Sequence, residues 1–294
     1  MATTLADLTY RVASELGIVR EGVATGGGTT SIIDTVGRSE AIHYWKDGTA
    51  WILYDAAGAG ALPQGQYSVI SDYTASNYTV TLRSTLTAIA ASDRYALAPK
   101  RFGLHDLIQA VNRTVLGIYI PTEDITTITT ATNKSEYSLP LAADLDLRQV
   151  WLQTNTGDSD DNLWRELTAW YVQHAATGTA DKLVFPVQPD NPYAIKLIYM
   201  APHLQMVNYN DALNEMVYPK RVVYRSALNA LLWYRDKTRS SEDWMMDGIR
   251  RMEQRAVETE NAYPIRAPVR AGKLMIVRDY DTSEVFEANK VRLS

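Results

Sequence analysis

The stretch "VATGGGTTSIIDT" (residues 23–35) lies where the pattern of the chain changes from helical to β. Three glycines followed by threonine suggest a phosphate loop, but a P-loop needs a lysine before its Ser or Thr, and this segment has none before Arg38. A dinucleotide fingerprint needs a strand before the glycines and a helix after them, and here the order is the reverse. We therefore predict a turn with glycines at positive φ that leads into a threonine-rich strand.

The residues before this stretch predict a helix, and those after it predict a sheet. Apolar residues recur at helical spacing from Leu5 to Leu16 and Gly17 follows, which predicts a helix over about residues 3–16. The runs "TAWILYDAA", "QYSVISDYT" and "NYTVTLRST" are short, rich in β-branched and aromatic residues, and separated by turn residues. They predict an antiparallel β domain over about residues 22–99.

The same alternation repeats further along the chain. "FGLHDLIQAVNRTVLGIYIP" predicts a second helix, and runs such as "LRQVWLQT" and "YAIKLIYMAP" predict a second β region. Pro219 and the apolar residues after it predict a third helix, and a fourth follows to about Asn261. We predict an α+β fold with a four-helix bundle core, two inserted antiparallel β modules and an extended C-terminal arm. Its parts are 1–21 (first bundle helix), 22–99 (β domain), 100–121 (second bundle helix), 122–204 (second β module), 205–263 (third and fourth bundle helices) and 264–294 (arm).

The composition is that of a folded protein without cysteine chemistry. The 294 residues are 46% hydrophobic and include no cysteine, which excludes disulfides, thiolate metal sites and cysteine nucleophiles. The opening "MATTLADLTYRVASEL" carries acidic residues in an amphipathic pattern, so we expect no signal peptide. No apolar run approaches the ~20 residues that cross a bilayer. The net charge of −5 argues against a nucleic-acid groove as the main surface.

No short motif predicts a metal, a cofactor or a nucleophile. Asp158, Asp160 and Asn162 begin like a calcium loop, but Leu163 and Ala169 stand where glycine and glutamate are needed. We expect a solvated turn there. The four histidines have no short metal-binding spacing, and the sequence contains no G-x-S-x-G elbow.

An enzymatic alternative concerns the second β region. Asp144 and Asp146 stand at alternate positions near a predicted strand edge, and His174 follows later. A pocket that gathers these three side chains would indicate a hydrolase or a glycan-active enzyme. Because no partner for the two carboxylates is identifiable, we expect a non-enzymatic protein with no cofactor.

Basic residues gather in the two last predicted helices. A solvated surface with salt bridges is the ordinary interpretation, because acidic residues are interspersed among them. The alternative is a surface that faces another subunit. The candidates for such an interface are Arg221, Arg225, Arg235, Arg250 and Arg251.

The tail over residues 264–294 combines charge with apolar runs. It has 6 Lys or Arg and 4 Asp or Glu, a net charge of +2, which leaves −7 for the rest of the chain. The segments "KLMIVRDY" and "SEVFEANKVRL" are capable of forming strands. A merely floppy terminus is usually poorer in such residues. We therefore favour an arm that adds strands to another subunit or fills a groove on it.

The succession of these segments resembles the head–tail adaptor (connector, or neck) proteins of tailed bacteriophages. "LADLTYRVASELG" followed by "ATGGGTTSIIDT" resembles the opening of many phage neck proteins, and "LHDLIQAVNRTVLGIY" resembles the second helix of the adaptors. "SEYSLP", "LRQVWLQT", "LWRELTAWYV", "DKLVFP" and "IKLIYMAPHL" follow the order of the family's inserted β module, and "VYPKRVVYRSALNALLWYRD" resembles its third helix. The resemblance covers nearly the whole chain through order and spacing.

The resemblance implies a role in virion assembly. It implies a ring, commonly of twelve copies, that docks beneath the portal in the virion neck, surrounds a DNA channel with transient contact to the genome, and is assembled in the host cytoplasm without a membrane. The β modules would meet tail, nozzle or fibre proteins. The alternative is a tail or baseplate protein whose β domains bind a receptor or glycan. The family's C-terminal arm docks against the portal, so the docking candidates are Lys273, Leu274, Ile276, Val277, Tyr280, Val285, Phe286, Val291 and Leu293.

Overall fold

The computed structural model describes residues 2–37, 39–139, 146–153, 164–173, 181–186, 193–239, 242–268, 276–278 and 285–287. The chain forms two compact units. Unit 1 comprises Met1–Ile118 and His203–Ile265, and unit 2 comprises Tyr119–Pro202 and Arg266–Ser294. Each unit is therefore built from two separate stretches of the chain.

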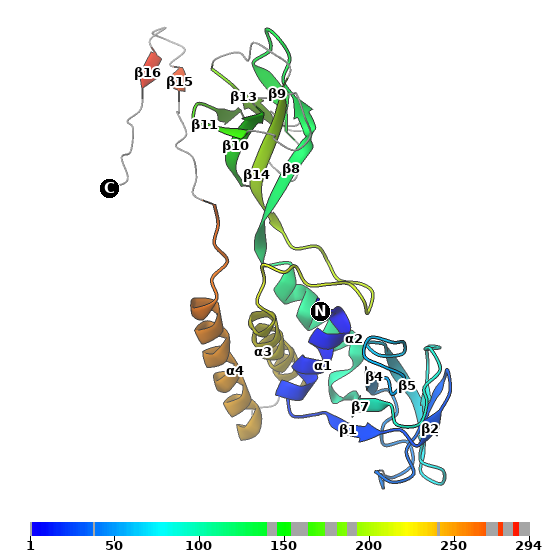
Figure 1. Cartoon of the computed structure of the whole chain (residues 1–294). Helices are drawn as coiled ribbons and strands as arrows, with labels where there is room; N and C mark the ends of the chain where they lie inside the picture. Colours follow the sequence, from blue (N-terminus) through cyan, green and yellow to red (C-terminus); the bar gives the residue numbers. More distant parts are fainter. Residues whose placement is uncertain are drawn as a thin grey trace. The chain divides into compact units, whose positions relative to one another are not determined.

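Among its described residues, unit 1 combines four α-helices with a seven-stranded sheet (Figure 1). The helices are α1 (Leu5–Glu15), α2 (Leu104–Val115), α3 (Pro219–Thr238) and α4 (Asp243–Ala262), with a 3-10 turn η1 (Lys100–Phe102) before α2. The strands are β1 (Arg20–Val23), β2 (Gly26–Gly27), β3 (Ser31–Ile33), β4 (Thr49–Tyr54), β5 (Tyr67–Thr74), β6 (Thr79–Leu82) and β7 (Arg94–Ala98). Their order is β1-β7-β4-β5-β6-β3-β2, and each neighbouring pair is antiparallel.

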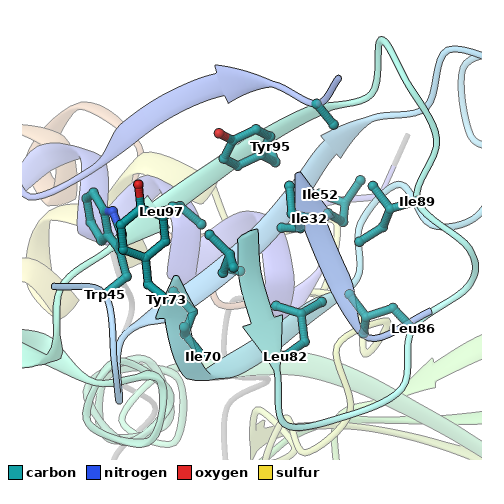
Figure 2. Packing of buried hydrophobic residues seen from close by; sticks show 13 residues of the cluster. Ile32, Trp45, Ile52, Ile70, Tyr73, Leu82, Leu86, Ile89, Tyr95 and Leu97 are labelled. Atoms are coloured by element: carbon teal, nitrogen blue, oxygen red, sulfur yellow. The ribbon is translucent and has the colours of Figure 1, made fainter. Parts of the chain in front are cut away.

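The sheet of unit 1 has its own cluster of buried apolar side chains (Figure 2). Along β6 the buried residues alternate with partly exposed ones, as in a strand with one face in the core. On β5 a register shift between Ile70 and Asp72 interrupts this alternation. The cluster consists of Ala24, Ile32, Trp45, Ala50, Ile52, Ile70, Tyr73, Val80, Leu82, Leu86, Ile89, Tyr95 and Leu97.

α1 lies where the apolar spacing predicts a helix, and it packs against the sheet. A capping box starts it: the Asp7 N–H donates to Thr4 Oγ1 at 3.3 Å, and the Thr4 N–H donates to the Asp7 carboxylate at 3.1 Å. On the buried side, Thr9 Oγ1 accepts a hydrogen bond of 3.1 Å from Trp51 Nε1 on β4. Both residues are almost fully buried, so this bond joins α1 to the sheet inside the core.

α3 packs against each of the other three helices. It begins at Pro219, which suits the first helical position because proline has no N–H to leave unpaired. Gly248 lets α4 approach α3 closely, since a Cβ there would lie 3.3 Å from Leu231 Cδ1. The Arg225 guanidinium of α3 also binds the Glu260 carboxylate of α4 at 2.7 Å.

The described residues of unit 2 form strands and the turns between them (Figure 1). The strands are β8 (Tyr119–Thr129), β9 (Glu136–Ser138), β10 (Leu147–Gln153), β11 (Trp164–Leu167), β12 (Tyr171–Gln173), β13 (Lys182–Val184), β14 (Ala194–Pro202), β15 (Ile276–Arg278) and β16 (Val285–Glu287). They form antiparallel sheets of order β11-β10-β14-β8 and β12-β13-β9, and β15 pairs with β16. One apolar cluster includes Val150 of the first sheet and Leu183 of the second, so these two sheets share a core.

The predicted fold class is wrong: the chain is β-rich and is not a four-helix bundle with inserted β modules. The described residues contain more strand than helix, and the largest fully buried side chains, such as Trp45 and Trp51, come mainly from the β regions. The physical reason is that the helices and the sheet share one compact unit. The Thr9–Trp51 bond shows that α1 packs against the sheet, which lies with the helices in one compact unit.

Candidate interaction surfaces

The glycine segment is a strand and not a turn at positive φ. Gly26 and Gly27 form β2, which pairs with β3, and neither they nor Gly28 have positive φ. Gly27 is required by a close approach instead, since a Cβ there would lie 2.6 Å from the Ser31 carbonyl oxygen. A strand does follow, since β3 spans Ser31–Ile33, but Thr29 and Thr30 lie before it, so the predicted threonine-rich strand and the predicted backbone conformation are both wrong.

Of the acidic and histidine residues considered for catalysis in the second β region, the structure describes only Asp146. Asp146 binds Arg148 at 2.6 Å, while Asp144, His174 and the loop 158–162 lie outside the described residues. His43 Nδ1 lies 2.5 Å from the Asp72 carboxylate on the exposed surface, and this hydrogen bond holds the pKa of Asp72 below its usual value. In the described part of the chain, no three His, Cys, Asp or Glu side chains gather as a possible metal site.

The segment 203–218 of unit 1, which we call the connecting loop, is held by many hydrogen bonds. It lies between the end of β14 and the start of α3. Backbone hydrogen bonds fasten it to the start of α1: the Leu5 N–H donates to the Asp211 carbonyl at 2.9 Å, and the Leu213 N–H donates to the Thr3 carbonyl at 2.8 Å. The connecting loop therefore has a defined conformation although it contains no helix or extended strand.

Two buried side chains fasten the connecting loop from inside. Asn112 of α2 donates from Nδ2 to the Met206 carbonyl at 2.8 Å and accepts the Met206 N–H at 2.9 Å. His203 Nε2 accepts the Asn214 N–H at 2.9 Å, which bridges two ends of the loop. Asn112 and His203 are both buried, so these bonds satisfy polar groups that water does not reach.

The connecting loop buries some apolar side chains and exposes others. Met206, Leu213 and Val217 are at most 4% exposed and hold the loop to unit 1. Leu204, Val207 and Met216 are 83%, 64% and 60% exposed. A loop that is held from inside and presents large apolar side chains outside is a preformed apolar surface.

Asp211 sets the electrostatics of the connecting loop. Its carboxylate accepts the backbone N–H groups of Val207 at 2.6 Å and Asn208 at 2.8 Å, and these bonds hold the pKa of Asp211 below its usual value. On β5, burial and, to a smaller extent, the negative charge of Asp211 raise the pKa of Tyr67 to about 12. The Tyr67 ring lies edge to face with Tyr209 at 6.3 Å, so the loop also packs against the sheet.

The five arginines predicted for a subunit interface lie on α3 and α4 in different surroundings. Arg225 binds Glu260, Arg235 binds the adjacent Asp236 at 3.0 Å, and Arg250 lies 3.9 Å from Asp247. Arg251 is exposed, and Arg221 lines a cavity beside Arg225. Sequence reasoning missed Arg113, which comes from α2 and lines the same cavity.

The predicted docking residues of the tail are only partly described. Ile276 and Val277 lie in β15, Val285 and Phe286 lie in β16, and the register places Val277 opposite Phe286. These two segments therefore pair with each other, and the docking role of the tail stays a prediction. The other candidates lie outside the described residues: Lys273, Leu274, Tyr280, Val291 and Leu293.

The connecting loop was not predicted as a surface. Its sequence "HLQMVNYNDALNEMVY" carried a signal, because Asn and Asp recur among apolar residues without a helical or strand period. Such side chains hydrogen-bond to nearby backbone and favour compact turns. What could not be read from the sequence is which of its apolar residues face outward.

Comparisons with known proteins assign no family to the chain. No protein-family model matches it, and no curated protein matches it significantly. The helices that the structure describes are also not long and apolar enough for any of them to cross a membrane.

Proposed function

We propose that this chain is a non-enzymatic virion structural protein, a head–tail adaptor that forms a ring between the portal and the tail of a bacteriophage. The order of its helical and β segments, which resembles that family, supports this role. Copies of the chain would surround the DNA channel in the virion neck, in a ring that commonly has twelve members. The portal would bind one side, and tail, nozzle or fibre proteins would bind the other.

The observation that carries the assembly role is the connecting loop. Ordering rotamer-rich side chains at an interface costs about 0.5–1.5 kcal/mol each. Part of the ordering cost is already met in this loop, because Asn112, His203 and the backbone of α1 hold it in one conformation. Leu204 and Val207 are then free to bury their apolar area against another protein.

The mass of the full-length protein, measured alone and with the portal protein of its virus, tests the proposal. We expect a monomer at micromolar concentration and a closed ring on the portal. The double variant Leu204→Asp/Val207→Asp places charges on the connecting loop and is expected to weaken ring formation, because charges resist burial. Val36→Asp is the control, since Val36 is 86% exposed but lies outside the connecting loop.

A wild-type protein that ignores the portal would overturn the adaptor role and favour a tail or baseplate protein that binds a receptor or glycan. Equal ring formation by the loop variant and the control would mean that the connecting loop is not needed for assembly. Circular dichroism of both variants verifies that they are folded before the masses are compared.

A further inference from the structure

Three arginines converge on one cavity of unit 1. The cavity has a volume of about 370 Å³ and lies where the end of α2 meets α3 and α4. Arg113 of α2 and Arg221 and Arg225 of α3 line it, together with Asn229 and Glu260. Arg113 is exposed and Arg221 is partly exposed, so both guanidinium groups can be reached from outside.

The floor of this cavity is held in place by hydrogen bonds. Thr114 Oγ1 accepts from Ser226 Oγ at 3.0 Å and from Asn229 Nδ2 at 3.0 Å, and donates to the Ala110 carbonyl at 3.0 Å. Ser226 is fully buried, and Thr114 is 7% exposed. The cavity is therefore built on a fixed link between α2 and α3.

The positive charge of the cavity is only partly balanced. Glu260 is its acidic residue, and both Glu260 oxygens are within 2.8 Å of Arg225 Nη2. The described part of the chain records no ion pair for Arg113 or Arg221, so the lining carries a net charge of two positive units, three arginines against one glutamate. An anion from outside would be attracted to it.

The position of Arg221 on α3 makes the cavity more attractive to an anion. Arg221 lies in the first turn of α3, where the helix dipole already concentrates positive charge, and this first turn contains no acidic residue. The placement of a cation there is unfavourable unless an anion lies nearby. An incoming carboxylate would interact with both guanidinium groups and with the end of the helix.

We propose that this cavity binds a carboxylate side chain of a second copy of this chain. The copies are themselves the complementary partner, because each carries 34 acidic residues and a net charge of −5. In a ring the two faces of every subunit contact are different, so a basic cavity on one face can meet acidic residues on the other. The inference deepens the proposed function and rests on it for the ring geometry.

The same features disfavour DNA as the occupant. A DNA duplex is bound by many phosphate contacts along an extended basic surface, whereas this site is a single concave cavity. A single carboxylate can instead bind the fork of one arginine with two hydrogen bonds.

Sedimentation velocity of the full-length protein, from micromolar to near-millimolar concentration, tests the proposal. We expect wild-type protein to associate weakly at the highest concentrations and the double variant Arg113→Glu/Arg221→Glu to associate at least about tenfold more weakly. The double variant Arg83→Glu/Lys100→Glu makes the same charge change outside the cavity and is expected to behave more like wild type. Arg113→Gln/Arg221→Gln serves as a second variant if charge reversal impairs folding.

Competition identifies the bound group. Glutarate is expected to inhibit wild-type association more strongly than inorganic phosphate or a short DNA duplex at equal ionic strength. Stronger inhibition by inorganic phosphate or by the DNA duplex than by glutarate would overturn the carboxylate assignment. The proposal is also overturned if wild-type protein does not associate at all, or if the cavity variants associate as strongly as wild type.

These outcomes are separable from the adaptor role, because the sedimentation assay contains no portal protein. A chain that associates through the cavity but ignores the portal would keep this inference and overturn the proposed function. If the chain still forms rings on the portal with both arginines replaced by glutamine, the proposed function is kept and this inference is overturned.

Discussion

The sheet cluster and the connecting loop of unit 1 place their apolar side chains in opposite directions. In the sheet, Ile70 and Tyr73 are completely buried. In the connecting loop, Leu204 and Val207 face outward although the backbone around them is fixed by hydrogen bonds to α1 and α2. Hydrophobic burial therefore organises the sheet, whereas polar bonds and a few buried anchors organise the loop.

The difference indicates which side chains serve folding and which are available for binding. The sheet also uses polar groups, such as the buried Asp34 carboxylate that accepts a hydrogen bond from Tyr95 Oη at 2.5 Å. These groups lie within a continuous apolar cluster. In the loop the outward apolar residues contribute little to the stability of the monomer, because folding leaves them in water.

Truncation of one apolar residue in each region gives the largest contrast. We expect Ile70→Ala to lower the free energy of unfolding by about 2–5 kcal/mol, because it removes buried methyl groups and leaves a cavity. Leu204→Ala is expected to change it by less than about 0.5 kcal/mol, because Leu204 is already solvated. Urea unfolding followed by tryptophan fluorescence measures both. If Leu204→Ala lowered the free energy of unfolding as much as Ile70→Ala does, the connecting loop would serve folding.

Removal of the Asn112 side chain is expected to have an intermediate effect. Asn112→Ala leaves the N–H and carbonyl of Met206 without their partner in a buried position, which costs about 1–3 kcal/mol. Hydrogen exchange should show the largest loss of protection at the Met206 amide, while the β4 and β5 amides keep theirs. Gln109→Ala is the control because Gln109 is exposed on the same helix. Uniform loss of protection across unit 1 would contradict a local role.

The sequence located the helices but did not show what they pack against. The spacing from Leu5 to Val12 located α1, and Pro219 located the start of α3, because both signals lie within a few residues. The Trp51–Thr9 bond joins residues 42 positions apart, and the Asn112–Met206 bonds join residues 94 positions apart. Periodicity contains no information about such pairs, so the bundle prediction failed and the connecting loop was missed.

The arginine surface shows the same limit. The sequence placed Arg221 and Arg225 on one helix, but it could not show that Glu260 binds only one of them or that Arg113 of α2 lies beside them. The net charge of a site depends on which ion pairs form. That depends on how three helices pack.

The smallest expected effect concerns the pH dependence of the connecting loop. The backbone N–H groups of Val207 and Asn208 stabilise the ionised Asp211, so its folded pKa lies below that of the unfolded chain, about 3.9. The stabilisation is therefore fully present above the unfolded pKa and is lost as pH falls through the lower folded value. The amide proton of Val207 should titrate with a midpoint below about 3.9 in an NMR titration of the folded protein.

The variant Asp211→Asn sharpens this test, because it keeps one acceptor oxygen but has no charge to lose. We expect the low-pH titration of the Val207 amide to disappear and the pKa of Tyr67 to fall from about 12, since the negative charge of Asp211 contributes to that increase. Ultraviolet titration of the tyrosines measures the second change. A Val207 midpoint at or above the ordinary aspartate value would mean that these N–H bonds do not hold the loop in solution. The sheet, whose cluster is apolar, should show no matching change at Ile52 or Ile70 over the same pH range.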